Sequence, residues 1–486
     1  MWKIDIKAPF GGYSPRWFKN TNSTYGNSNQ ANAMTNIDMS DPSALKQGYA
    51  GITLTGNDNL TAEMVDITES SYSFALGIEN TALLHFINSA IVDSDSMVNF
   101  PHTIAGSSVV GYSVYQSVLG SFYFYKTNSG ADIGKVDNLD GTPTYDDDWG
   151  STEDDNLEVK TGAKYPVTGI NVNDLSYMVF GNIQYMGYYD GTTLDVQAMD
   201  FGDGKVVSDM SATNDYVYVS VNDGEGEYTH TKGIIYVVSD PTSTTWVDTI
   251  NVNGKIGATI AKDGIVYVFH KKNASDEVTL SYINGNRLEK ILTFGSTSYD
   301  FDDLPRYGQV TIWKDLIIFA SGTKIYSFGQ IAEGQNNILF SNLAPEHTKD
   351  IGAVANTGGK LYVSSSNGSD EHDISYYSGN TVTADYTSLV FNTSDGDSLS
   401  MIDSVTVYTN ALVSGASCDL KIYKNQGQTL AKTITIDTAG KTRHVSRELG
   451  LNGMEDFKIV LDWSGGSASN LVDIRKISIK GHNYEY

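Results

Sequence analysis

The eight histidines are the first residues to consider for metal binding or proton transfer. They are His85, His102, His230, His270, His347, His372, His444 and His482. No two of them have the spacing of a metal-binding motif such as His-Glu-x-x-His, which places two imidazoles on one helix face. His270 ends an apolar run, and we interpret it as a hydrogen-bonded strand-end residue rather than a ligand or a catalytic base. The histidines therefore predict no metal centre.

Carboxylates gather in one loop, TYDDDWGSTEDDNLEVK. This loop holds Asp146, Asp147, Asp148, Glu153, Asp154 and Asp155. Two carboxylates ~5–9 Å apart can hydrolyse a glycoside, and carboxylates are also calcium ligands. Adjacent loop carboxylates repel each other, however, and neither DNLDG at Asp137 nor SDGD at Ser394 fits the calcium-loop spacing. We predict a solvated loop, with calcium binding and glycan cleavage as the alternatives.

Motifs for nucleophilic or nucleotide chemistry are missing from the sequence. There is no nucleophile elbow, P-loop or dinucleotide fingerprint, and GDGKVVS from Gly202 lacks the P-loop length. Neither the Asp-box repeats of sialidase propellers nor the GH…WD signature of WD40 repeats occurs. The single cysteine, Cys418, lies within a strand-like run and is predicted to be a small core residue. We expect no catalytic residue and no cofactor, and hence a protein that is not an enzyme.

The composition excludes several further classes. The 486 residues carry a net charge of −26 and no Lys/Arg cluster longer than two, which argues against a phosphate-binding surface. One cysteine allows no intrachain disulfide, which favours folding in a reducing cytoplasm. No window approaches the ~20 apolar residues of a membrane span, and the opening residues hold no apolar stretch typical of a signal peptide.

The same short phrase recurs along the middle of the chain. A polar turn leads into β-branched and aromatic residues in ATNDYVYVSV from Ala212 and AKDGIVYVFH from Ala261, and again in several other places. The turn residues are Asp174, Asp215, Asp263, Asp315 and the pair Gly358 and Gly359. They are 41, 48, 52 and about 44 residues apart, and each begins a run with the alternation or continuity of a strand.

Most of these runs have a downstream partner that ends in a second turn, such as YYDG, YING or YYSG. Four strands per ~40–50 residues are typical of a β-propeller blade. Five units are clear, and weaker ones begin near Ser73 and Ser107, so we predict about seven blades, with six as the alternative. An irregular all-β array is the other interpretation. Helical periodicity is nearly absent.

Both ends of the chain differ from the middle. Residues 1–60 are rich in Asn, Gly, Ser and Met, and we predict an extended N-terminal arm that lies against this chain or a neighbouring subunit. Trp17 and Phe18 are its candidate anchors; packing on their own propeller is the alternative. Residues 61–385 are predicted to form the propeller. Residues 386–486 have six to eight short strand signals, in the order of a β-sandwich or jelly roll.

This layout resembles that of tailed-bacteriophage virion proteins. The resemblance rests on the arm FGGYSPRWF…QANAMTNIDMSDPSALKQG, in which Gly-Tyr-Ser-Pro-Arg ends at Arg16, on the degenerate propeller, and on the terminal sandwich opening TSLVFNTSDGDSLSMIDSVTVYT. In short-tailed phages a propeller-bearing nozzle protein forms a ring at the tail tip. The chain is shorter than typical nozzle proteins. The resemblance implies no catalytic residue.

We therefore expect a structural component of a virion tail, assembled in the host cytoplasm. Its expected partners are copies of itself in a ring and other tail or neck proteins, and DNA would pass without tight binding. Arg16, Trp17 and Phe18 are the expected subunit-interface residues. A receptor- or carbohydrate-binding virion protein and a glycan-cleaving propeller are the alternatives.

Overall fold

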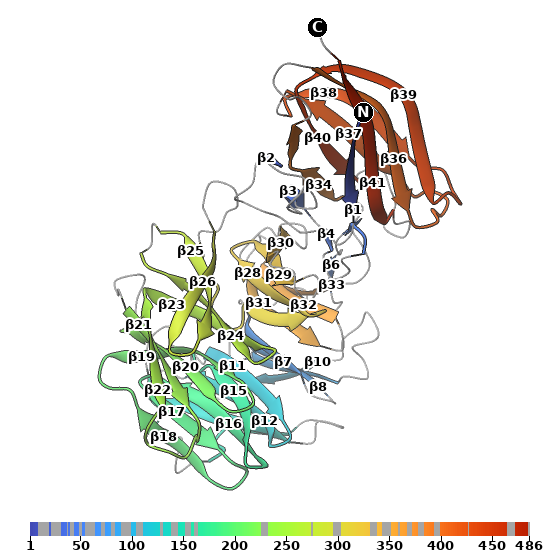
Figure 1. The fold of residues 1–486 in the computed structure, drawn as a ribbon. Helices are drawn as coiled ribbons and strands as arrows, with labels where there is room; N and C mark the ends of the chain where they lie inside the picture. Colours follow the sequence, from blue (N-terminus) through green and yellow to red (C-terminus); the bar gives the residue numbers. More distant parts are fainter. Residues whose placement is uncertain are drawn as a thin grey trace.

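The chain is all-β in the part that the structure describes (Figure 1). The computed structural model describes residues 1–7, 19–20, 31–35, 37–38, 43–47, 51–53, 64–69, 73–78, 83–88, 99–103, 110–126, 130–137, 144–150, 157–159, 164–224, 232–273, 276–294, 303–330, 338–342, 351–357, 360–366, 372–377, 383–392, 399–425, 427–463 and 472–484. Within these ranges there is no helix that is long and apolar enough to cross a bilayer.

In the described part of the chain, seven antiparallel units of four strands form a β-propeller, which confirms the predicted seven blades; six units are separate sheets, and the strands of blade six belong to a larger sheet. Blade one is β7 (Met64–Glu69), β8 (Ser73–Ile78), β9 (Leu83–Asn88) and β10 (Asn99–Thr103); blade two is β11 (Val110–Ser117), β12 (Gly120–Lys126), β13 (Ala131–Asp137) and β14 (Thr144–Asp146). Blade three is β15 (Val167–Val172), β16 (Leu175–Asn182), β17 (Tyr185–Tyr189) and β18 (Leu194–Asp200); blade four is β19 (Lys205–Ala212), β20 (Val217–Asp223), β21 (Lys232–Val238) and β22 (Asp248–Asn253). Blade five is β23 (Lys255–Lys262), β24 (Ile265–Lys271), β25 (Val278–Asn284) and β26 (Arg287–Phe294); blade six is β27 (Val310–Trp313), β28 (Leu316–Ser321), β29 (Lys324–Gln330) and β30 (Ile338–Asn342).

A strand from before blade one completes blade seven. This blade contains β31 (Ile351–Thr357), β32 (Lys360–Ser366) and β33 (His372–Tyr377), and its fourth strand is β6 (Gly51–Thr53). Residues Gly51, Ile52 and Thr53 pair antiparallel with Tyr377, Tyr376 and Ser375. The first strand of blade seven, β31, lies beside β7 of blade one. The ring is therefore closed by joining an early segment of the chain to a late one.

The turns that repeat in the sequence join the first two strands of successive blades. Asn173 and Asp174 both have positive φ, as do Asp263 with Gly264 and Lys314 with Asp315. Two consecutive positive φ angles define the two-residue hairpin turn whose twist matches the flanking strands. Asp215 occupies the turn between β19 and β20. The Gly358–Gly359 turn lies outside the described residues.

The C-terminal part is a sandwich of two sheets, seen at the upper right of Figure 1. One sheet has the order β1 (Trp2–Lys7), β41 (Ile474–Tyr484), β36 (Leu399–Thr409), β39 (Arg443–Met454). The other contains β38 (Thr429–Ile436), β37 (Cys418–Lys424), β40 (Asp456–Asp462), β34 (Asp385–Ser388) and β35 (Val390–Asn392). Trp2 of β1 stacks on Phe457 of β40 with 6.0 Å between ring centroids, so the first strand of the chain helps join the two layers.

The described strands of residues 1–60 pair with strands of the same chain, so this part of the predicted arm lies against its own chain. Besides β1 and β6, β2 (Lys19–Asn20) pairs with β35, and β4 (Ile37–Asp38) pairs with β5 (Lys46–Gln47). The strand β3 (Ala31–Thr35) pairs with β34 of the sandwich and, at Thr35, with Asn342 of blade six. Sequence patterning missed these pairings because short polar strands carry no alternation of their own.

Candidate functional site

The predicted interface residues Arg16, Trp17 and Phe18 lie outside the described residues. They fall between β1, which ends at Lys7, and β2, which begins at Lys19. Both of these strands are paired within the sandwich. The interface therefore stays a prediction.

The structure describes residues 144–150 and 157–159 of the acidic loop. The Tyr123 hydroxyl donates a hydrogen bond to the Asp147 carboxylate, and the Tyr125 hydroxyl donates to the Asp147 carbonyl at 2.6 Å. Burial of Tyr123, and then the hydrogen bond and charge of Asp147, raise the pKa of the tyrosine well above its usual range. Asp147 thus ties the loop to blade two. Glu153, Asp154 and Asp155 lie outside the described residues.

The remaining candidates from the sequence are the isolated residues Cys418 and His270. Within the described ranges, no group of three His, Cys, Asp or Glu side chains is close enough to hold a metal ion. Cys418 is fully buried in the sandwich, as predicted, and burial raises the pKa of its thiol well above the usual value. His270 is hydrogen-bonded to the Ser281 hydroxyl at 2.9 Å, which agrees with its interpretation as a strand-end residue.

A cavity of 420 Å³ lies on the propeller axis, between the innermost strands of six blades. Its polar wall includes the buried residues Asp209, Ser211 and Thr259. The Asp209 carboxylate accepts hydrogen bonds from Thr259 and from the Met210 N–H at 2.8 Å. These contacts fasten neighbouring blades, and the cavity has the size of a small-molecule pocket rather than of a bore for duplex DNA.

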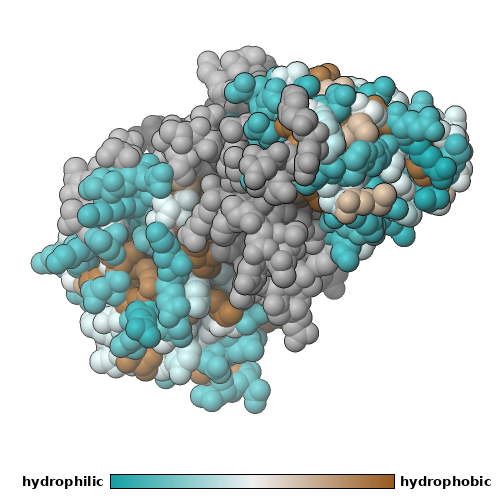
Figure 2. Space-filling model, turned by 45° about the horizontal axis from the view of Figure 1, so that its top comes forward, coloured by the Kyte–Doolittle hydropathy of each residue, from teal (hydrophilic) through white to brown (hydrophobic). Residues whose placement is uncertain are grey.

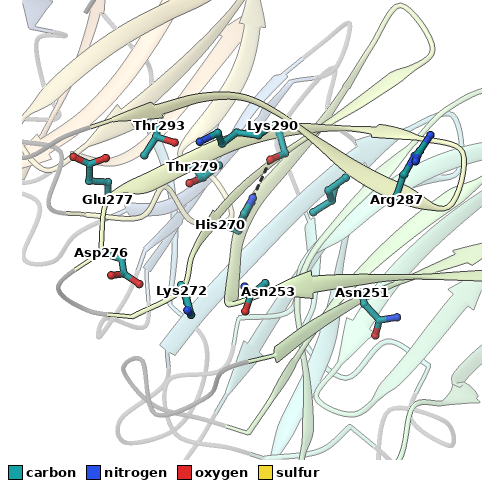
Figure 3. A pocket seen from close by; sticks show the side chains of 12 residues that line it. Asn251, Asn253, His270, Lys272, Asp276, Glu277, Thr279, Arg287, Lys290 and Thr293 are labelled. Carbon is teal, nitrogen blue, oxygen red and sulfur yellow. Dashed lines mark hydrogen bonds between the residues drawn. The ribbon is translucent and has the colours of Figure 1, made fainter. Parts of the chain in front are cut away.

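A second hollow, of 750 Å³, lies between the outer strand of blade four and one face of blade five (Figure 3). We call it the blade 4–5 groove; its lining residues are Asn251, Asn253, His270, Lys272, Asp276, Glu277, Thr279, Ser281, Arg287, Leu288, Lys290 and Thr293. Asn251 and Asn253 come from β22, and the other ten come from blade five and the turn between β24 and β25.

Strand register places the polar groove residues on one face of blade five. His270 is directly opposite Thr279, and Thr279 is directly opposite Thr293, so these three side chains form a row across β24, β25 and β26. Ser281 is opposite Lys290 in a neighbouring row. Directly opposed residues in an antiparallel pair point to the same side of the sheet.

The same face of blade five is apolar where it meets blade four. Val266 and Val268 of β24 pack in one buried cluster with Ile235, Val237 and Ile250 of blade four. Two and four residues beyond Val268 on the same face are His270 and Lys272, where the face becomes hydrophilic. Burial lowers the pKa of His270 to about 4, so the imidazole is neutral at pH 7.

This groove has none of the catalytic or metal-binding spacings by which a site can be recognised in a sequence. The available signal was the recurrence of polar residues in three successive strands of one blade, at 270 and 272, at 277, 279 and 281, and at 290 and 293. A face that packs against a neighbouring blade should be apolar at such positions.

No protein-family model matches the chain, and no curated protein matches it. Among solved structures, it is similar to a streptogramin B lyase at 12% identity and a TM-score of 0.43, over 68% of this chain and 97% of that one. It is also similar to the computationally designed Ika8 protein (12%, TM-score 0.40, 68% and 100%) and to BamB from Moraxella catarrhalis (13%, TM-score 0.36, 65% and 84%). These similarities carry no argument about function, and the fold assignment rests on the sheet topology.

Proposed function

We propose that the chain is a structural, non-catalytic subunit of a tailed-phage virion tail, where it forms a ring with copies of itself and contacts other tail or neck proteins. Assembly would take place in the host cytoplasm. The resemblance of the sequence to tail proteins suggests this role. The observation that best supports it is the way in which the N-terminal strands join the propeller to the sandwich.

The strand β3 makes one sheet continuous from the sandwich through to blade six, because it pairs with β34 and with Asn342 of β30. In addition, β1 pairs with the last strand, β41, and β6 closes the propeller. A body whose two parts share hydrogen-bonded strands resists bending between them, which suits a load-bearing subunit.

The charge distribution is compatible with a DNA conduit that does not bind DNA. Residues 61–385 contain 43 Asp and Glu against 17 Lys and Arg, so the propeller part carries essentially the whole net charge of the chain. Figure 2 shows a largely hydrophilic described surface with hydrophobic residues in small separate groups. DNA would pass through the centre of a ring of subunits, because the axial cavity of one propeller is only 420 Å³.

The test is the mass of the purified chain together with the composition of virions. Mass photometry should find closed assemblies at a fixed multiple of 52.9 kDa, and negative-stain images should show rings. The pair Trp17→Ala and Phe18→Ala should shift the assemblies toward monomer, whereas Tyr216→Ala, which removes an exposed propeller aromatic, should not. A chain that stays monomeric and is absent from purified virions of the phage that encodes it would refute the proposal.

A second candidate function, binding of a carbohydrate receptor, is supported by the blade 4–5 groove. Its lining has hydroxyl, amide and charged groups in a volume within the ~300–1,000 Å³ range of ligand pockets. A glycan array probed with the purified chain tests this function. Binding that is unaffected by changes in the groove would assign the activity to another surface.

A further inference from the structure

We propose that the blade 4–5 groove binds an anionic carbohydrate, with Lys272, Lys290 and Arg287 facing its acidic groups. This inference deepens the second proposed function and names the class of ligand. It does not depend on where the chain resides or on whether it forms a ring. It rests on the polarity of one sheet face, on an excess of cationic groups, and on the size of the hollow.

The first observation is that a face that packs against blade four at one end is hydrophilic at the other. At Val266 and Val268 the two blades exclude water through apolar contacts. Beyond Val268 the row of His270, Thr279 and Thr293 faces the hollow instead, as Figure 3 shows. Polar side chains in these positions do not contribute the free energy of hydrophobic burial that the neighbouring valines contribute.

The second observation is the charge of the groove. Lys272, Lys290 and Arg287 are exposed and bring three positive charges to it, in a propeller part with an excess of acidic residues. Among the described residues, neither lysine forms an ion pair with a carboxylate. The Arg287 guanidinium is 76% exposed and lies 4.0 Å from Glu289.

The nearby carboxylates are mostly engaged elsewhere. The Asp276 carboxylate accepts a hydrogen bond from Asn273 at 2.7 Å. Glu289 is not a groove residue, and its carboxylate accepts hydrogen bonds from Tyr282 and Asn284, both at 2.7 Å. Glu277 is exposed at one end of the groove. The lining thus holds three cations against the two carboxylates of Asp276 and Glu277, and neither Lys272 nor Lys290 is paired with a described carboxylate, which favours a ligand that brings its own negative charge.

The third observation concerns what gives affinity in this groove. Ligand pockets usually gain affinity from apolar and aromatic walls, but the described lining includes no aromatic side chain and one large apolar one, Leu288. Affinity must then come from charge-assisted hydrogen bonds, which are about twice as strong as neutral ones. This favours an acidic saccharide over a neutral one, with Asn251, Asn253 and Thr279 as partners for its hydroxyl groups.

Size and charge density separate this ligand from other anions. A hollow of 750 Å³ is far larger than phosphate or sulfate. Duplex DNA carries one charge per ~1.7 Å, and the acidic propeller around the groove would repel it along its whole length. A sugar acid spreads its charges over whole monosaccharide units, so two or three cations can match them.

The experiment is calorimetric titration of the full chain with trigalacturonate at 150 mM salt, where a Debye length of ~8 Å screens the remote carboxylates of the propeller. Maltotriose, inorganic phosphate and an aspartate-rich peptide form the comparison arms. We expect saturable binding of trigalacturonate alone. Lys290→Gln should weaken it about tenfold, as should Lys272→Gln, because each removes a charge-assisted hydrogen bond.

The matched control is Lys480→Gln, which makes the same charge change at an exposed lysine of the sandwich and should leave binding unchanged. The proposal is overturned if trigalacturonate does not bind at millimolar concentration, or if Lys480→Gln weakens binding as much as the groove variants do. Stronger binding of phosphate or of the acidic peptide also overturns it. Binding of maltotriose alone, lost on changing Thr279 and Asn253, would keep the carbohydrate function and refute the anionic ligand.

Discussion

The Asp209 carboxylate of blade four accepts hydrogen bonds from both the backbone N–H and the hydroxyl of Thr259 in blade five; the hydroxyl contact is 3.2 Å. Both residues are buried on inner strands beside the propeller axis. Farther along the same pair of blades, the Asn222 amide accepts from the Ile256 N–H and donates to its carbonyl, both at 2.9 Å. Buried polar side chains thus satisfy backbone groups of the next blade.

Replacing Asp209 by alanine should destabilise the propeller by about 2–3 kcal/mol, because the Thr259 groups and the Met210 N–H lose their acceptors while buried. Asparagine should cost less, since it keeps one of the two acceptor oxygens. Urea unfolding followed by tyrosine and tryptophan fluorescence measures both effects. The control is Asp203→Ala at an exposed turn, which should stay within about 0.5 kcal/mol of the wild type. Equal midpoints for Asp209→Ala and Asp203→Ala would contradict the role of the inter-blade contact.

The propeller could be predicted from the sequence because its signals are local. Blades three, five and six repeat a turn with positive φ, as at Asp263 and Gly264, followed by an apolar strand. The closing strand β6 and the sandwich strand β1 could not be predicted in the same way. Their partners lie more than 300 residues away, and a three-residue strand such as Gly51–Thr53 has no periodicity to read. The sequence shows that polar residues recur in three successive strands of blade five, but only the strand register shows that they form rows on one face.

Deleting residues 1–7 should loosen the C-terminal sandwich although they are at the other end of the chain. The deletion removes the strand that covers the edge of β41, together with fully buried Ile6 and the Trp2 ring on Phe457. Hydrogen exchange should become faster in β41 and β36, while exchange in β15–β18 of blade three stays unchanged. Unaltered exchange in β41 would mean that β1 contributes little to the sandwich.

Asp5 should make the sandwich sensitive to acid. Partial burial acts to raise the pKa of this carboxyl, but hydrogen bonds from Lys3, Ser478 and Lys476 and the charge of Lys476 outweigh it and lower the pKa to about 2. A carboxyl with a lowered pKa stabilises the folded state above the pKa of the unfolded chain, and this stability is lost as the pH falls from about 4 to about 2. The effect should be about 1 kcal/mol, because solvent partly screens the ion pairs.

Asp5→Asn tests this by removing the titration. At pH 7 the variant should be less stable than the wild type, and the difference should shrink to near zero at pH 2. Parallel stability curves for the two proteins between pH 5 and pH 2 would show that the ion pairs with Lys3 and Lys476 contribute nothing.

Folding should lower the pKa of His270, whereas it raises the pKa of an exposed histidine that gains a carboxylate partner. Burial lowers its pKa to about 4, so between pH 6.5 and pH 4 the unfolded chain binds a proton that the folded chain does not. Stability therefore falls as the pH is lowered through this window, by up to about 3 kcal/mol. The His270→Gln variant does not titrate, so the stability advantage of the wild type should decrease by that amount between pH 7 and pH 4 in urea unfolding.

An anion bound beside Lys272 and Lys290 would favour the protonated imidazole. Trigalacturonate should therefore reduce the loss of stability of the wild type at low pH, and it should not change the pH dependence of the variant's stability. A pH-independent difference between the two proteins would show that the imidazole is solvated rather than buried against the blade.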